Sequence, residues 1–246
     1  MKKIFFILLL ISCSVHAQVV NIEQERIKSD TTGITGTGQV SFQYLKEKSE
    51  VFNMGAGLHL QYKSSKGLAL CITDYSFSKA AGANYANAGI QHLRYNYKIN
   101  NWLAPEVFTQ VQFNKILHVN FRWLLGTGPR FTIVKNKSLR IYTGLSYMYE
   151  YEELVNSIYD RNHRLSSYVS LSYKLGENAS IINTTYYQPL FNNFTDYRVS
   201  SQTDMKIQFA KHFAFKVGYV YFIDKKPAEG VPRETQNFRN TISFSF

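Results

Sequence analysis

Cysteine is almost absent from this chain, which argues against a disulfide-stabilised fold. Only Cys13 and Cys71 occur among the 246 residues, and Cys13 falls in an apolar N-terminal segment. No metal ligands accompany Cys71 at a useful spacing, so we predict that it is a small apolar residue on a strand. The six histidines are scattered and no carboxylate cluster accompanies them. We therefore predict no metal site and no bound cofactor.

Long hydrophobic runs are also missing beyond the N-terminus. Met1 to Lys3 is a short basic region, Ile4 to Ile11 is apolar, and Val15-His16-Ala17 places small or slim residues before a cleavage point. This order predicts a secretory signal peptide that is cut after Ala17. A lipoprotein signal is the alternative, because Leu10-Ile11-Ser12-Cys13 fits a lipidation box. No later run approaches the ~18 apolar residues that a transmembrane helix needs.

Acidic residues and proline are in short supply, whereas basic and aromatic residues are abundant. Lys and Arg number 28 against 17 Asp and Glu, which gives a net charge of +11 at pH 7. No nucleic-acid motif accompanies this charge, so we expect lipopolysaccharide phosphates or anionic solutes as partners and no nucleic acid. The 18 Tyr and 18 Phe, against five Pro, favour the aromatic-rich wall of an outer-membrane barrel.

Polar and apolar residues alternate with a period of two along most of the chain, which predicts an all-β fold. The runs approach the ~9–11 residues with which a tilted strand crosses a bilayer. About twelve strands are expected, at residues 38–45, 51–62, 68–77, 89–99, 102–113, 120–134, 139–149, 164–175, 179–188, 197–210, 213–223 and 236–246. The prediction is a single antiparallel transmembrane β-barrel.

The connections between these strands fall into two length classes. Tight links such as Asn100-Asn101 and Lys211-His212 alternate with a set that includes the long ones, Ser78 to Ala88, Glu150 to His163, Pro189 to Asp196, and Asp224 to Thr235. Short periplasmic turns and longer external loops are typical of bacterial outer-membrane barrels. We therefore predict a signal peptide over 1–17, a periplasmic N-terminal tail over 18–36, and a barrel over 37–246 in the outer membrane of a Gram-negative cell.

The last strand carries a second targeting signal. Phe238 to Phe246 alternates in polarity and the chain stops on an aromatic residue. Such an ending is typical of outer-membrane barrels, whose final strand is recognised by the barrel assembly machinery. Phe244 and Phe246 are the expected insertion signal, with that machinery as a partner during biogenesis.

Basic residues recur on the face opposite the apolar one, and the alternation assigns them to the lumen. Charges pointing into hydrocarbon would cost ~2–4 kcal/mol each at the midplane, which supports this orientation. The lumen-lining candidates are Arg94, Lys98, Arg122, Arg130, Arg140, Arg198, Lys206, Lys216 and Arg239. The acidic residues expected on that face are Asp74, Glu106, Glu150 and Asp204, so a positive surplus is predicted. Gly126 and Gly128 are expected to clear space for Arg122 and Arg130.

Two segments carry a family resemblance: His92-Leu93-Arg94-Tyr95-Asn96-Tyr97-Lys98-Ile99-Asn100-Asn101-Trp102-Leu103 and Arg122-Trp123-Leu124-Leu125-Gly126-Thr127-Gly128-Pro129-Arg130-Phe131. With the strand pattern they resemble the salt-induced outer-membrane protein family. Val20-Asn21-Ile22-Glu23 and Asp30-Thr31-Thr32-Gly33 fit the same family. The resemblance implies an outer-membrane barrel without an assigned activity, so it carries over no catalytic residues.

Three functions remain open from the sequence. The first is a small pore whose basic lumen passes anionic or small polar solutes. The second is a structural or interaction barrel with a filled lumen, in which arginines brace the interior. A lipid-modifying enzyme is the third, and we expect no enzyme because no serine joins the scattered histidines in a recognisable motif. We also expect a monomer surrounded by outer-membrane lipid and lipopolysaccharide.

Overall fold

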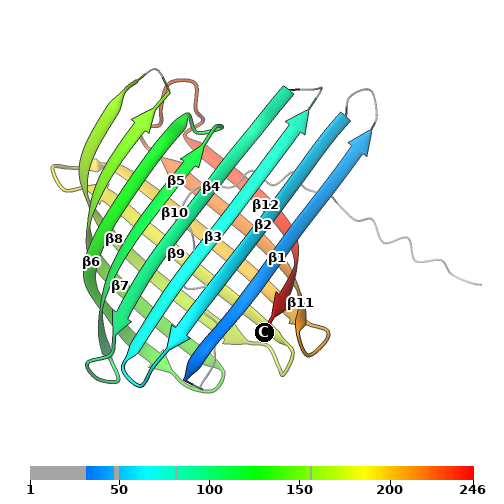
Figure 1. The fold of residues 1–246 in the computed structure, drawn as a ribbon. Helices are drawn as coiled ribbons and strands as arrows, with labels where there is room; N and C mark the ends of the chain where they lie inside the picture. The colour runs from blue at the N-terminus through cyan, green and yellow to red at the C-terminus, as the bar shows by residue number, and fades with distance from the viewer. Residues whose placement is uncertain (1–31, 47–49, 81–82, 156) are drawn as a thin grey trace, which may run out of the picture.

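The computed structural model describes residues 32–46, 50–80, 83–155 and 157–246, and these form one closed antiparallel β-barrel (Figure 1). Each strand is paired with its sequence neighbour, and β1 closes the barrel by pairing with β12. The strands are β1 Gly33–Lys46, β2 Glu50–Lys63, β3 Gly67–Ala80, β4 Ala83–Tyr97, β5 Leu103–Asn114, β6 Val119–Lys135, β7 Leu139–Leu154, β8 Tyr159–Lys174, β9 Ala179–Leu190, β10 Asn193–Gln208, β11 Phe213–Asp224 and β12 Glu234–Ser245. The predicted all-β barrel of about twelve strands is confirmed.

Among the described residues, no helix is long and apolar enough to cross a membrane. The predicted signal peptide and most of the predicted tail lie outside the described residues. β1 begins at Gly33, ahead of the expected barrel start at residue 37.

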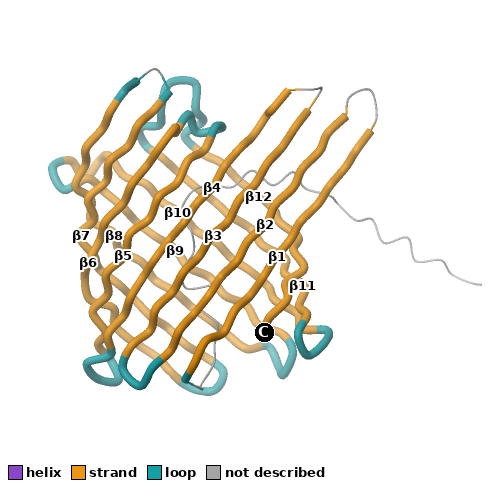
Figure 2. The backbone as a smooth tube through the Cα atoms, in the orientation of Figure 1, coloured by secondary structure: helices purple, strands orange, loops and turns teal. Residues whose placement is uncertain are grey.

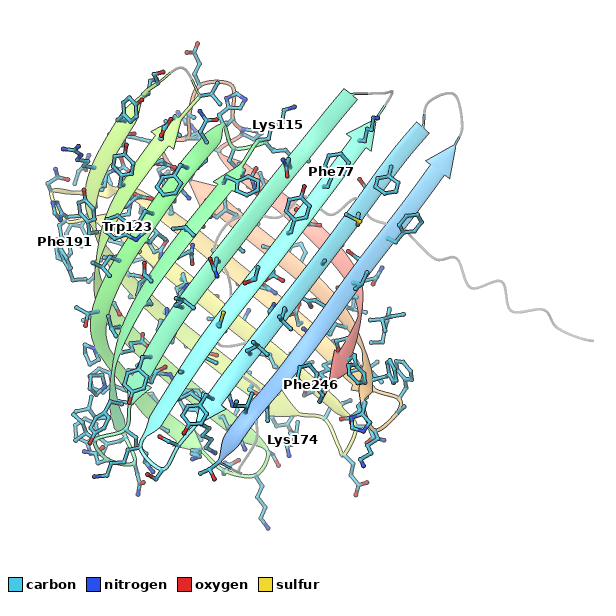
Figure 3. All side chains as sticks on the ribbon, in the orientation of Figure 1. Phe77, Lys115, Trp123, Lys174, Phe191 and Phe246 are labelled. Carbon is cyan, nitrogen blue, oxygen red and sulfur yellow. The ribbon has the colours of Figure 1, made fainter. Side chains whose placement is uncertain are left out.

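The two rims of the barrel are distinguished by the ends of the chain. β1 starts and β12 ends at one rim, called here the terminal rim, which lies at the bottom of Figure 1. The opposite rim is called the distal rim. Lys174 lies at the terminal rim with Phe246, whereas Lys115 lies at the distal rim (Figure 3). The sequence prediction places the terminal rim in the periplasm.

Several strands are longer at the distal rim than the sequence indicated. β7 continues to Leu154 and β8 starts at Tyr159, so most of the expected loop from Glu150 to His163 is strand. Figure 2 shows the result, with strand occupying most of the chain and short connections at both rims. Only residues 225–233, between β11 and β12, keep the length expected of an external loop. The expected long loops were therefore largely wrong, because most of their residues belong to strands, among them Glu152 and Asp196, which are buried in the lumen.

Alternation along each strand separates an outer wall from a lumen. Outward side chains are mainly apolar and exposed, for example Ile34 at 74% and Phe42 at 68%. Inward side chains are mainly polar and buried, as Thr184 and Ser200 show. An apolar outer band over a polar interior is the arrangement that a barrel in a bilayer requires, because lipid offers polar groups no hydrogen bonds.

The turns at the terminal rim are stabilised locally by asparagine. The Asn100 carboxamide oxygen accepts hydrogen bonds from the backbone N–H groups of Trp102 and Leu103, at 3.0 and 2.8 Å. Asn136 does the same for Ser138 and Leu139. Such side chains satisfy backbone donors within the turn and allow a tight reversal of the chain. These asparagines therefore favour the tight turns locally, while the strands they join are held by the barrel ladders.

The closing seam is the shortest ladder in the barrel. β1 and β12 are in register only from Thr37↔Ser245 to Val40↔Ile242, followed towards the terminal rim by reciprocal 3.1 Å backbone hydrogen bonds between Gly36 and Phe246. The Phe246 ring lies where a side chain on residue 36 would stand, 2.3 Å from an ideal Cβ. Glycine at position 36 thus permits the last residue of the chain to complete the barrel.

Candidate functional site: the charged lumen

The most prominent feature of the lumen is an ion-pair cluster in its distal half. Five strands contribute its members, Arg122, Glu150, Glu152, Arg164, Asp196, Arg198 and Asp224. Glu150 is its centre, because it pairs with three arginines: Arg122 at 3.2 Å, Arg164 at 2.8 Å, and Arg198. Its side chain is 1% exposed. A buried carboxylate of this kind is tolerated only when surrounding cations and hydrogen bonds replace its hydration.

The cluster joins strands that are not neighbours. Arg198 on β10 binds Glu150 and Glu152 on β7, although β8 and β9 lie between these strands in the barrel. The same guanidinium donates from Nε to Asp224 Oδ2 at 2.7 Å on the adjacent strand β11. Arg198 therefore spans part of the lumen, which braces the barrel and narrows its bore.

A second network lies closer to the terminal rim and is centred on Glu106. Its Oε2 accepts hydrogen bonds from Arg94 Nη1 at 3.1 Å and Asn96 Nδ2 at 2.8 Å. The Tyr168 hydroxyl on β8 donates to the same oxygen at 3.4 Å, across the intervening strands β6 and β7. Arg94 also stacks 4.7 Å from the centre of the Phe108 ring. The lumen is therefore bridged at two levels.

A third polar group lies on β1 to β3, beside the seam. His59 Nε2 is 3.0 Å from Asp74 Oδ1, and the Gln39 amide donates to the same oxygen at 3.0 Å. Gly57 makes this approach possible, because a Cβ there would lie 2.1 Å from that carboxylate oxygen. His59 is buried, whereas the Asp74 side chain keeps 21% exposure.

The structure places most of the predicted lumen-lining residues on the inward face, with different degrees of burial. Arg94, Arg122, Arg130 and Arg198 are buried, whereas Arg140, Lys206 and Lys216 are half-buried. Arg130 stacks on the Tyr142 ring with its guanidinium carbon 3.8 Å from the ring centre.

Lys98 is different: it is exposed in the turn after β4, so its assignment to the lumen was wrong. The Arg239 side chain lies outside the described part of the chain, and its backbone pairs with Gly218.

Three of the four acidic members of the distal cluster were missed at the sequence level, whereas Glu150 was expected on the lumen face. Glu152, Asp196 and Asp224 fall in segments that were read as external loops, where charge is usually solvated. Because β7, β10 and β11 extend further, all three point inward. The described lumen therefore holds six buried acids, Glu106, Glu150, Glu152, Asp196, Asp204 and Asp224, against five buried arginines, Arg94, Arg122, Arg130, Arg164 and Arg198. The expected positive surplus was wrong for these buried charges.

The remaining basic surplus is confined to the terminal half. Arg140, Lys206 and Lys216 are inward and half-buried within the last few residues of their strands at that rim. Lys206 and Lys216 are direct register partners on β10 and β11. The described lumen is thus close to charge balance at the distal end and positive at the terminal end.

The expected role of Gly126 and Gly128 was also wrong. The space beside Gly126 is filled by the Phe108 ring, 2.3 Å from an ideal Cβ. Gly128 faces the backbone of the next strand, with the Leu145 carbonyl oxygen 2.1 Å from an ideal Cβ. These glycines accommodate a ring and a neighbouring strand, and the arginines are held by carboxylates and Tyr142 instead.

A cavity of about 260 Å³ lies at the distal end, against the ion-pair cluster. Arg164, Asp196, Arg198 and Asp224 contribute its charged lining, together with Asp160 and Lys226. The lining also includes Arg122, Glu152 and Asn162. Apolar residues complete it and come partly from the loop after β11, including Pro227 and Val231. On the other side of the cluster a smaller cavity of about 30 Å³ lies among His92, Arg94 and Met148. The cluster therefore separates a roomy chamber from a tightly packed centre.

Residues 39–246 match the family described as a protein of unknown function, DUF481. The chain belongs to that family. The match supports the prediction of an uncharacterised barrel family. The description of the matched family does not mention the salt-induced outer-membrane protein family that the sequence resembles. Among curated proteins, none matches the sequence of this chain.

Solved structures share the fold of this family member. A NanC porin superposes with a TM-score of 0.52 at 10% identity, covering 87% of this chain and 98% of the porin. An outer membrane channel from Pseudomonas putida F1 gives a TM-score of 0.56 at 7% identity, covering 89% and 97%. At these identities the likeness shows the fold alone. The fold is that of outer-membrane β-barrels.

The histidines of this family member lie in separate places. His163 was expected in an external link, which was wrong: it lies on β8 and faces outward, 2.5 Å from the Tyr147 hydroxyl. His59 and His92 are buried and inward. No group of three or more His, Cys, Asp or Glu in the described segments is arranged to hold a metal ion.

Proposed function

We propose that this protein is a narrow outer-membrane pore for small polar and anionic solutes. The observation that carries the proposal is the chamber of about 260 Å³, which is lined by charged groups and ends on the ion-pair cluster. Polar and charged walls can hydrogen-bond the water around a hydrated solute, which suits a pore. The shared fold with a porin and an outer membrane channel is compatible with this function.

The two halves of the lumen would act differently on a solute. At the distal end, Arg198 and Arg164 are neutralised by Glu150, Asp196 and Asp224, so the cluster limits size more than charge. At the terminal end, Arg140, Lys206 and Lys216 create a positive field that favours anions. The expected selectivity is therefore a modest anion preference that fades as salt screens the field.

A barrel with a filled lumen is the second candidate, and a specific observation favours it. Met148 and Ile72 point inward and are 1% and 0% exposed, and Arg198 and Tyr168 bridge non-adjacent strands. Packing of this density suits a structural or interaction barrel. In that case the ion pairs brace the wall and no solute passes.

Conductance in planar bilayers separates the two candidates. The pore proposal predicts small, discrete conductance steps from the purified full-length protein. It further predicts larger steps when the cluster is removed as a pair by Glu150→Ala with Arg198→Ala, a change that leaves net charge unaltered. A silent wild type together with a silent double variant, both folded by heat-modifiable migration, would exclude the pore and leave the filled barrel.

Location and biogenesis complete the proposal. We propose export by a signal peptide over 1–17, which lies outside the described residues, and insertion in the outer membrane by the barrel assembly machinery through Phe244 and Phe246. Phe244 packs 5.2 Å from the Phe213 ring on the outer wall, and both terminal aromatics are exposed there. The surrounding partners would be outer-membrane lipid and lipopolysaccharide. Mass spectrometry of the mature N-terminus distinguishes cleavage after Ala17 from a lipidated Cys13.

A further inference from the structure

An uncharged polar patch interrupts the apolar outer wall on β9 and β10. The β9–β10 polar patch consists of Asn183, Thr185, Ser201 and Thr203, which form two directly opposed register pairs, Thr185↔Ser201 and Asn183↔Thr203. Its members lie near the middle of both strands, away from either rim. They point outward, because the intervening residues Thr184 and Gln202 are buried in the lumen. The patch therefore faces the hydrophobic part of the bilayer.

The four side chains are hydrogen-bonded to one another. The Asn183 amide nitrogen donates to Thr203 Oγ1 at 2.9 Å, and Ser201 Oγ and the Gln202 carbonyl oxygen lie 3.3 Å from it. Thr185 Oγ1 is 2.8 Å from Ser201 Oγ and donates to Asn183 Oδ1 at 3.4 Å. These bonds hold the groups in place on the surface of the sheet and leave their outer sides pointing away from the barrel.

Other outward hydroxyl groups are accommodated in a different way. Thr109, Thr127 and Thr143 each donate to a backbone carbonyl of the neighbouring strand, at 3.2, 3.0 and 2.8 Å. A single threonine can satisfy its donor in this way at little cost in lipid. The Asn183 amide is hydrogen-bonded within the patch, but the patch still gathers four polar side chains at one place on the wall, and polar surface is costly to present to hydrocarbon. The patch is thus poorly suited to a lipid neighbour.

The shape of the patch permits another wall to approach closely. Three of its four side chains are no larger than threonine, and towards the distal rim they are bordered by the rings of Tyr187 and Tyr197, 5.5 Å apart. Small polar residues at a contact within a membrane allow close approach and provide hydrogen bonds between chains.

The chemistry of the patch selects its partner. Every member is uncharged, and each side chain can both donate and accept hydrogen bonds. Two identical patches related by a two-fold axis can therefore satisfy each other, which is the arrangement of an isologous dimer. We propose that the β9–β10 polar patch is the contact surface between two copies of this chain in the membrane. This departs from the monomer expected from the sequence and is independent of whether the lumen conducts.

Cysteine cross-linking in native membranes tests the contact, and the chain supplies its own control. Cys71 lies on β3, at the opposite side of the ring of strands from β9. Thr185→Cys in a Cys71→Ser background is expected to give, after mild oxidation, a species of twice the chain mass on a gel without reductant. The native chain, with Cys71 as its barrel thiol, is expected to stay monomeric. The Cys71→Ser chain without a new cysteine reports any cross-link through Cys13.

Equal cross-linking from Cys71 and from Thr185→Cys would indicate random collision and overturn the proposal. The proposal would also be overturned if the native chain and the Thr185→Cys variant both stayed monomeric. A cross-linked species of another mass would overturn it as well, because it would identify a different partner. In the Thr185→Cys background, Asn183→Leu with Thr203→Val is expected to reduce the dimer several-fold while heat-modifiable migration persists. Thr143→Val is the matched control, because it removes an outward hydroxyl elsewhere on the wall and should leave the dimer unchanged.

Discussion

Individual carboxylates in this lumen neutralise several cations at once. Glu150 pairs with Arg122, Arg164 and Arg198 from three different strands. Removing such a centre takes one buried carboxylate from each of three guanidinium groups, which keep only their pairs with Glu152, Asp196 and Asp224. The stability of the distal half should therefore depend on this residue more than on any exposed acid.

Glu150→Gln is expected to destabilise the barrel by about 1.5–3 kcal/mol, because it weakens buried hydrogen bonds to charged arginines while keeping the side-chain volume. Urea unfolding in lipid vesicles, followed by tryptophan fluorescence, measures the difference. Glu153→Gln is the control on the same strand, since Glu153 is only half-buried and belongs to no cluster. Equal stability of Glu150→Gln and the wild type would contradict the structural role of the cluster.

Glycine positions differ in what a side chain would meet. An added Cβ at residue 128 would lie 2.1 Å from the Leu145 carbonyl oxygen and 2.6 Å from the Ser146 Cα, which are backbone atoms that cannot rotate away. Gly128→Ala should therefore destabilise the barrel by about 1–3 kcal/mol through overpacking. Gly38→Ala is the matched control, because no atom lies within 4 Å of its added Cβ. A comparable loss in both variants, measured by urea unfolding, would show that the effect is not steric.

Among the elements, β12 has the most demanding role, since it must pair with β11 along its length and still close on β1. Its ladder with β1 is short, and the reciprocal hydrogen bonds between Phe246 and Gly36 extend it. The last residue therefore contributes a backbone contact as well as an exposed aromatic ring.

Deletion of Phe246 is expected to reduce folded, heat-modifiable protein severely while export continues, because both the ring and the two closing hydrogen bonds are lost. Phe246→Ala keeps the hydrogen bonds and removes only the ring. Comparing the two by gel migration of outer-membrane fractions separates recognition from closure. If the deletion folds at the wild-type yield, neither role of Phe246 is supported.

At the scale of the whole molecule, the lumen is divided by charge along its axis. The distal half is balanced by the cluster, whereas Arg140, Lys206 and Lys216 make the terminal half positive. A field of this kind acts on ions without contacting them and depends on salt. If the pore conducts, selectivity should therefore depend on the terminal half.

Lys206→Gln with Lys216→Gln is expected to abolish most of the anion preference, seen as a reversal potential close to zero across a potassium chloride gradient. Lys98→Gln is the control, because it makes the same Lys-to-Gln substitution at a residue that is exposed outside the strands. An unchanged reversal potential in the double variant would show that these lysines do not determine selectivity.

The period-two alternation along the chain determined the all-β barrel, the strand number and the inward phase of most charged residues. This pattern is local, since it depends on a residue and its next few neighbours along one strand. Tertiary structure alone decided how far the strands extend at the distal rim, and with it whether Glu152, Asp196 and Asp224 belong to a loop or the lumen. It also decided that Arg198 reaches Glu150 across two strands, that Phe108 fills the space beside Gly126, and that Asn183 meets Thr203. A charged strand end and a charged loop have the same local sequence, and only pairing with the next strand distinguishes them.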